Sequence, residues 1–244
     1  MAVSSDDAAH YIGNELELFE HATHWKSYYG RFLQPYLRGR RVLEVGAGLG
    51  GTTRSLCDGS QTDWLCLEPD ARLAARITDL LAQRQLPACC RLRVGTLATT
   101  PAGEEGLFDA ILYIDVIEHI EDDAAELARA YARLAPGGVL LIIVPAHQWL
   151  FSPFDTALGH FRRYSRARVQ QALPAGSRVL RLHYLDSVGL LASAANKMML
   201  RQSYPTKGQI GFWDGTLVPL SRLADRLTGF AVGKSVLAVA QKPA

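Results

Sequence analysis

The middle of the chain alternates between short, continuous apolar runs and longer segments whose apolar residues recur at helical spacing. The apolar runs are residues 41–45, 64–67, 91–94, 108–114 and 139–144, and the helical segments are 52–58, 71–85 and 122–134. Continuous apolar strands are typical of a parallel sheet that is covered on both faces. Because crossovers between parallel strands are right-handed, this alternation predicts a doubly wound α/β fold.

The two ends of the chain depart from this alternation. Aromatic and apolar residues recur at helical spacing over residues 10–38, which predicts one or two amphipathic helices ahead of the sheet. Near the other end, residues 178–185 and 235–240 have the character of strands. The long segment between them, 187–233, contains an apolar helix candidate at 188–200, and an insert of this length is more often functional than idle.

These patterns predict a single domain over residues 1–244. A helical cap (1–40) would precede the core (41–146), and the region 147–244, with the 187–233 insert, would follow it. The apolar side chains of the insert fit an acceptor wall, a homodimer surface or a membrane-facing patch, and the sequence leaves these open.

Composition narrows the range of partners. Hydrophobic residues make up 48% of the chain and charged residues 20%, which excludes disorder as the main state. Twenty-six basic residues against 24 acidic ones are too balanced for a chain whose main partner is nucleic acid. The first residues lack the pattern of a signal peptide, and the longest apolar run, 139–145, is too short to span a bilayer. We therefore expect a cytoplasmic protein without stable membrane insertion.

The four cysteines are Cys57, Cys66, Cys89 and Cys90. No two of them have the CxxC spacing of a zinc site, so we expect reduced thiols in a reducing compartment.

A glycine-rich loop follows the first predicted strand and opens the first helix. Gly46, Gly48 and Gly51 satisfy the GxGxxG pattern of dinucleotide-binding proteins, while Gly46, Gly48 and Gly50 satisfy GxGxG. Glu44 distinguishes the two, because it stands just before the loop, where it would repel a pyrophosphate and attract a cationic α-amino group. S-adenosylmethionine (SAM) carries such a cation and no phosphate.

A second acid, Glu68, closes the next strand about 20 residues after the loop, the usual place of a carboxylate that holds ribose hydroxyls. SAM and NAD(P) would both use it. An NAD(P)-dependent oxidoreductase is disfavoured by Glu44 and by the lack of a Tyr-x-x-x-Lys pair. A third alternative, a module that binds the cofactor without turnover, stays open because a fold does not determine a function.

Four segments together resemble the motifs of class I SAM-dependent methyltransferases. They are VLEVGAGLG (42–50), LCLEPD (65–70), FDAILYIDVIEHIEDD (108–123) and LAPGGVLLIIVPA (134–146). The resemblance implies a Rossmann-like seven-stranded sheet of order 3-2-1-4-5-7-6 whose last strand, 235–240, is antiparallel. It also implies methyl transfer from SAM, and we expect a small-molecule acceptor that is methylated on oxygen or nitrogen.

Carried over residue by residue, the resemblance gives a set of cofactor contacts. Gly46, Gly48, Gly50, Glu44 and Asp115 would meet the methionine part, Glu68 the ribose, and Pro69, Asp70, Thr96 and Leu97 the surroundings of the adenine. Relatives often place an acid near the adenine after the third strand, where this chain reads Gly95-Thr96-Leu97.

The acceptor side offers two histidines. A hydroxyl acceptor needs a base to remove its proton, and His147 and His160 follow the fifth strand at the edge where the site is expected. The resemblance leaves open a divalent metal on Asp115, Glu118, His119 and His160, because some methyltransferases carry ExxEH here, although a metal-free site is our prediction. Arg162 and Arg163 would either hold an anionic acceptor or cap the sheet.

Aromatic residues of the cap, Tyr11, Trp25, Tyr28 and Tyr29, would form either part of a lid or part of the core.

Overall fold

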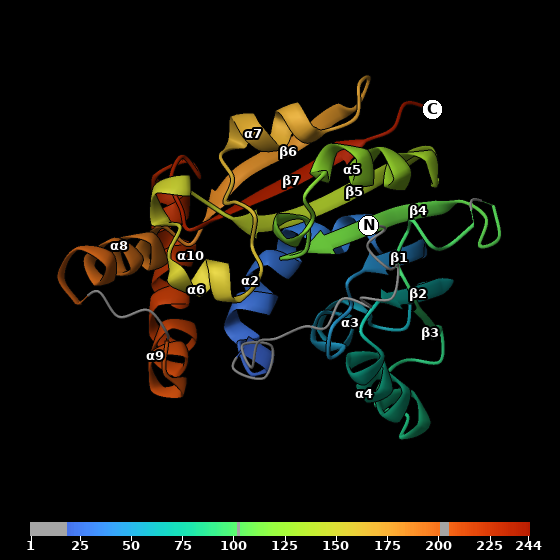
Figure 1. The fold of residues 1–244 in the computed structure, drawn as a ribbon, viewed down its shortest axis with the longest axis horizontal. Helices are drawn as coiled ribbons and strands as arrows, with labels where there is room; N and C mark the ends of the chain where they lie inside the picture. Colours follow the sequence, from blue (N-terminus) through green and yellow to red (C-terminus); the bar gives the residue numbers. More distant parts are fainter. Residues whose placement is uncertain (1–18, 102, 201–204) are drawn as a thin grey trace, which may run out of the picture.

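The computed structural model describes residues 19–101, 103–200 and 205–244, and every structural statement below concerns these residues. Seven strands form one sheet of order β3-β2-β1-β4-β5-β7-β6 (Figure 1). The strands are β1 (Arg41–Val45), β2 (Asp63–Glu68), β3 (Cys90–Val94), β4 (Phe108–Ile114), β5 (Leu134–Pro145), β6 (Arg178–Leu185) and β7 (Ser235–Gln241). Strand β7 runs antiparallel to both of its neighbours, so the predicted fold and strand order are confirmed.

Helices cover both faces of the sheet (Figure 1). One face carries α2 (Thr23–Leu33), α3 (Gly51–Leu56) and α4 (Ala71–Ala82), and the other carries α5 (Asp123–Ala132) and α7 (Arg166–Ala172). Successive strand residues therefore enter different cores: Val42 packs on the α2 side and Leu43 on the α5 side. This burial on both faces explains why the strands read as continuous apolar runs.

The remaining helices fall into two groups. η1 (Gln34–Tyr36) follows α2, and η2 (Ile117–His119) follows β4. After β5 come η3 (Gln148–Leu150), α6 (Pro153–Ala157), α8 (Ser187–Ala195), η4 (Asn196–Leu200), α9 (Lys207–Phe212), η5 (Trp213–Leu217) and α10 (Val218–Leu227). In Figure 1, α8, α9 and α10 gather at one end of the sheet beside α2. No helix among the described residues combines the length and the apolar character that crossing a membrane requires.

The fifth strand is longer than the apolar run predicted. Phe108 pairs with Leu134 and Ala110 with Val139, so residues 135–138 bulge between two paired positions of β4 and β5. The segment Pro136-Gly137-Gly138, whose composition is typical of a turn, therefore lies inside the strand, where the positive φ of Gly137 (75°) accommodates the bulge.

Two buried aspartates of the insert accept hydrogen bonds from α2. Asp214 accepts hydrogen bonds from the backbone N–H of His24 and Trp25, at 3.1 and 2.8 Å. Asp225 accepts one from the Tyr28 hydroxyl at 2.7 Å, and two from backbone N–H groups at the start of α8. The side chains of Trp25, Tyr28 and Tyr29 are buried, which favours core packing over a mobile lid for them, while Tyr11 lies outside the described residues.

Candidate cofactor and active site

The glycine loop turns sharply at the carboxyl end of β1. Gly46, Gly48 and Gly50 have positive φ angles of 69°, 57° and 78°. A Cβ added to Gly46 would lie 2.7 Å from a methyl group of Val116. Glycine is therefore required there both by the positive φ angle and by the lack of space for a side chain. The N–H of Gly46 donates to the carbonyl of Leu67 at 2.8 Å, which fixes the loop against β2.

Glu68 is bound to this loop. The carboxylate is buried, and its two oxygens accept hydrogen bonds from the backbone N–H groups of Gly48 (2.7 Å) and Asp70 (2.9 Å). Burial raises the pKa of Glu68 above its ordinary value, against the effect of these two bonds. Each carboxylate oxygen can accept a second hydrogen bond, so the group retains capacity for two ribose hydroxyls. Pro69 separates Glu68 from Asp70, which caps the N-terminus of α4.

Glu44 points into the layer between β2 and α3. It is 2% exposed, and one of its oxygens accepts hydrogen bonds from the Thr53 hydroxyl (2.6 Å) and from Nε1 of Trp64 (2.9 Å). Burial raises its pKa to about 7. In this structure Glu44 therefore joins the loop helix to the neighbouring strand, and its contact with the amino group of SAM stays a prediction.

The other predicted cofactor residues follow β3 and β4. Thr96 forms a turn with Thr99, whereas the side chain of Leu97 is 2% exposed and belongs to the core on the α5 side. Asp115 has a positive φ of 54° and is exposed, as a residue lining a cleft would be. The protein atoms around its carboxyl still reduce the hydration of that group, which raises its pKa to about 6.

His147 lies immediately after β5, also with a positive φ (67°). Its Nε2 is 2.9 Å from the carbonyl oxygen of Gly233, and its ring stacks on Tyr184 at 5.0 Å between centroids. A carbonyl only accepts hydrogen bonds, so Nε2 carries the proton and Nδ1 is the basic nitrogen. Burial lowers the pKa of His147, which keeps the imidazole neutral near pH 7 and able to accept a proton.

His160 is part of an ionic cluster over the loop after β5. Its Nδ1 lies 3.0 Å from Asp155, which is fully buried and also accepts two hydrogen bonds from Arg163. Burial alone would raise the pKa of Asp155, but these bonds outweigh it and hold the pKa well below its usual value. Arg162 in turn donates to the carbonyl of Ile120. Both arginines therefore have protein partners, which favours the capping role over anion binding.

Three potential metal ligands meet beside this cluster. One ligand atom from each of Glu118, His119 and His160 lies within 4.8 Å of the others, and the two imidazoles approach edge to face. Both oxygens of Glu118 are buried and have no hydrogen-bond partner among the described residues, while burial and the charge of Asp115 raise the pKa of Glu118. Carboxylate and imidazole donors fit a hard or borderline divalent cation. Asp115 is not part of this mutual cluster.

Lys234 is a candidate site residue, near Asp115, that the sequence patterns did not indicate. Its Nζ stands 4.9 Å from the centre of the Trp213 ring, and burial lowers its pKa, although Asp186 and Asp115 oppose that shift. The residue precedes the last strand in a loop without motif character, so only the packing of the insert reveals it.

Comparison with known proteins adds to this geometry. The methyltransferase domain family matches residues 18–195, well over half of the chain. The chain belongs to this family. A ubiquinone biosynthesis O-methyltransferase of Xanthomonas oryzae pv. oryzae is 35% identical to this chain over 108 residues. The match covers 43% of each protein, so it spans less than half of that relative's length.

Solved structures resemble the methyltransferase chain over most of its length. Coclaurine N-methyltransferase bound to N-methylheliamine and SAH covers 89% of this chain and 72% of its own, with a TM-score of 0.61 and 12% identity. The [4+2]-cyclase SpnF covers 91% and 81%, with a TM-score of 0.62 and 16% identity. At these identities the similarity establishes the fold alone.

Proposed function

We propose that this chain transfers the methyl group of SAM to a small-molecule oxygen or nitrogen acceptor. The observation that carries the proposal is the hydrogen bond between Gly48 and Glu68, which joins a glycine loop of positive φ angles to a buried carboxylate. This pair lies at the carboxyl ends of β1 and β2, beside the point where the strand order reverses, and open α/β sheets bind their ligands there. Membership of the methyltransferase domain family supports SAM as that ligand.

In this proposal each cofactor residue has one role. Glu68 accepts hydrogen bonds from the ribose hydroxyls, and the loop glycines allow the methionine part to approach the backbone. Asp115, open to solvent after β4, meets the amino group of the methionine part. Methyl transfer is an in-line displacement, so the protein has to align the acceptor, the methyl group and the sulfur, and to exclude water.

The acceptor would approach His147 at the carboxyl edge of the sheet, because the hydrogen bonds of Asp214 and Asp225 close the contact between α2 and the insert. O-methylation is the favoured chemistry, because His147 presents a neutral imidazole with Nδ1 as base, and because several curated relatives are named O-methyltransferases. A hydroxyl acceptor would pass its proton to Nδ1 as the new carbon–oxygen bond forms. An amine acceptor, which is already nucleophilic, would not need this step.

Binding of SAH, the product form of SAM, tests the cofactor class. We expect calorimetric titration to give micromolar binding of SAH and none of NADH. Glu68→Gln should weaken SAH binding by about 1–3 kcal/mol, which corresponds to roughly 5- to 150-fold, because a charge-assisted acceptor is lost. Glu104→Gln is the matched control, since Glu104 is an exposed acid that pairs only with Arg93 in the described contacts. Binding of NADH alone would instead indicate an oxidoreductase, and unchanged affinity of Glu68→Gln would refute the ribose assignment.

Turnover separates an enzyme from a binding module. Transfer of labelled methyl groups from SAM to a panel of phenols and amines should identify the acceptor class. Tight SAH binding without transfer to any of them would favour the non-catalytic module, and the [4+2]-cyclase shows that this fold also serves other chemistry.

A divalent cation on Glu118, His119 and His160 is the second candidate, and the two unpartnered oxygens of Glu118 favour it. When bound, such a cation would lower the pKa of an acceptor hydroxyl. We expect chelation with EDTA to reduce methyl transfer and Mg²⁺ or Mn²⁺ to restore it. An unchanged rate in EDTA would show that His147 acts without a metal.

A further inference from the structure

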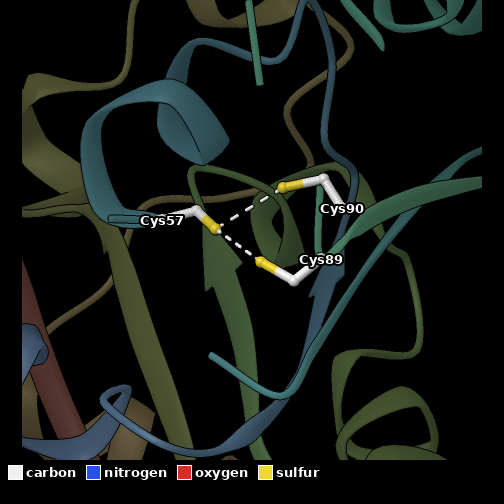
Figure 2. Close-up of side chains that lie close together, drawn as sticks. All are labelled: Cys57, Cys89 and Cys90. Carbon is white, nitrogen blue, oxygen red and sulfur yellow. Dashed lines mark hydrogen bonds between the residues drawn. The ribbon is translucent and has the colours of Figure 1, made fainter. Parts of the chain in front are cut away.

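Three of the four cysteines meet at the edge of the sheet that lies away from the glycine loop. Figure 2 shows the Cys57 sulfur between those of Cys89 and Cys90. The Sγ of Cys57 lies 3.4 Å from that of Cys90 and 3.6 Å from that of Cys89. Cys57 ends α3, and the other two stand at the start of β3, so the fold brings together residues that are far apart in the sequence.

These separations suit one ion bound by three sulfurs. Two thiolates on a tetrahedral Zn²⁺, at about 2.3 Å each, stand about 3.8 Å apart. The three sulfurs also lie within 4.8 Å of one another, so all of them can reach a common centre after small side-chain movements. A disulfide would join only two of the three sulfurs. Cys57 lies almost equally close to both of the others, which a shared ion explains and a single disulfide does not.

The surroundings of Cys57 supply a partner for a bound thiolate. The thiol of Cys57 donates to Oε1 of Gln61 at 3.3 Å, while Nε2 of the same buried amide has no hydrogen-bond partner among the described residues. Rotation of the Gln61 amide by 180° would bring Nε2 to the sulfur in place of Oε1. The amide would then donate a hydrogen bond to the thiolate, whereas it now accepts one from the thiol. Such outer hydrogen bonds are typical of metal-bound thiolates.

The cluster is also accessible to an ion and separate from the cofactor edge. Cys90 lines an open groove of about 930 Å³ between α4 and the start of β3. It stands four residues before Val94, the end of that strand, and four residues of strand span about 13 Å. An ion there would contact neither the cofactor nor the acceptor.

We propose that Cys57, Cys89 and Cys90 form a binding site for a thiophilic d¹⁰ cation of the Zn²⁺ class. Each thiol that binds gives its proton to the solvent, and no electrons are transferred. The bound ion connects the end of α3 to the start of β3, and α3 is the helix that follows the glycine loop. The site therefore stabilises the support of the cofactor loop and takes no part in methyl transfer.

Titration of the reduced, metal-free full chain with Cd²⁺ tests this proposal. We expect a thiolate-to-cadmium charge-transfer band that saturates at one ion per chain, and Zn²⁺ should displace the Cd²⁺. Cys57→Ser should weaken binding at least roughly 100-fold, because a ligand is lost and outer hydrogen bonds alone are worth 10- to 100-fold. Cys89→Ser, at the partly exposed member, provides a second variant if Cys57→Ser does not fold.

Two controls assign the band to this cluster. Cys66→Ser removes a buried cysteine that is bonded to Thr53 and is not part of the cluster, and it should leave the band intact. His160→Ala disables the other candidate metal site and should also leave it intact. A missing band at one equivalent, a band that survives in both Cys57→Ser and Cys89→Ser, or loss of two thiols to a disulfide before any ion binds would each overturn the proposal.

Discussion

The burial of Glu44 predicts that this protein loses stability as the pH rises through neutrality. Glu44 has an ordinary pKa of 4.5, and burial raises it to about 7 in the fold. Between these values the folded protein binds a proton that the unfolded chain has released. The contribution of Glu44 to stability is therefore fully present below about pH 4.5 and is lost as the pH rises through about 7.

The size of this effect follows from the shift of about 2.5 pKa units. At 1.36 kcal/mol per unit, the upper limit is about 3 kcal/mol, and about 2.5 kcal/mol of it falls between pH 5 and pH 8. For a chain of this size, that loss lowers Tm by about 5–10 °C. The variant Glu44→Gln keeps the shape and an acceptor for Thr53 or Trp64, but it does not titrate.

Urea unfolding of the wild type and of Glu44→Gln at several pH values between about 5 and 8 measures this term. Other groups with shifted pKa values, such as Asp115 and His119, titrate in both proteins, so their contributions cancel in the difference. We expect the stability of the wild type relative to the variant to fall by about 2–3 kcal/mol over this range. Parallel curves with a constant offset would refute the reasoning, because they would mean that hydrogen bonds from Thr53 and Trp64 keep Glu44 ionised at pH 5.

Two further predictions concern the active site and the insert. His147→Ala should leave SAH affinity unchanged while lowering kcat for a hydroxyl acceptor by about 10²–10⁴-fold, and normal turnover would remove His147 as base. Asp225→Ala should cost about 3–5 kcal/mol in urea unfolding, because it leaves the buried Tyr28 hydroxyl and two backbone N–H groups without their acceptor. Asp225→Asn, which keeps one acceptor oxygen, should cost clearly less, and equal costs would contradict this account.

The strands and the cofactor loop were predictable because local sequence determines them. A strand that is buried on both faces has to be apolar throughout, and the runs at 41–45 and 108–114 match β1 and β4 residue for residue. The glycine spacing likewise reflects backbone angles that only glycine adopts easily. Glu68 was predictable as a strand-end acid, but its hydrogen bond to Gly48 was not, since it depends on how β1 and β2 are placed side by side.

Features that depend on tertiary packing were not predictable. Cysteine spacing argued against a thiol cluster, yet α3 brings Cys57 beside Cys89 and Cys90. The bulge in β5 was missed because a Pro-Gly-Gly sequence resembles a turn, whereas pairing with β4 on both sides of it keeps it within the strand.

The contacts between α2 and the insert also set an order of events during synthesis. The acceptors of α2 lie far along the chain from it: 190 residues separate His24 from Asp214, and 197 separate Tyr28 from Asp225. These docking partners are therefore translated about 190 residues after the helix itself. Strand β7, which fills the gap between β5 and β6, comes later still. The nascent chain therefore carries the apolar face of α2 without this docking surface while the roughly 190 intervening residues are made, and during this period a chaperone would find that face exposed.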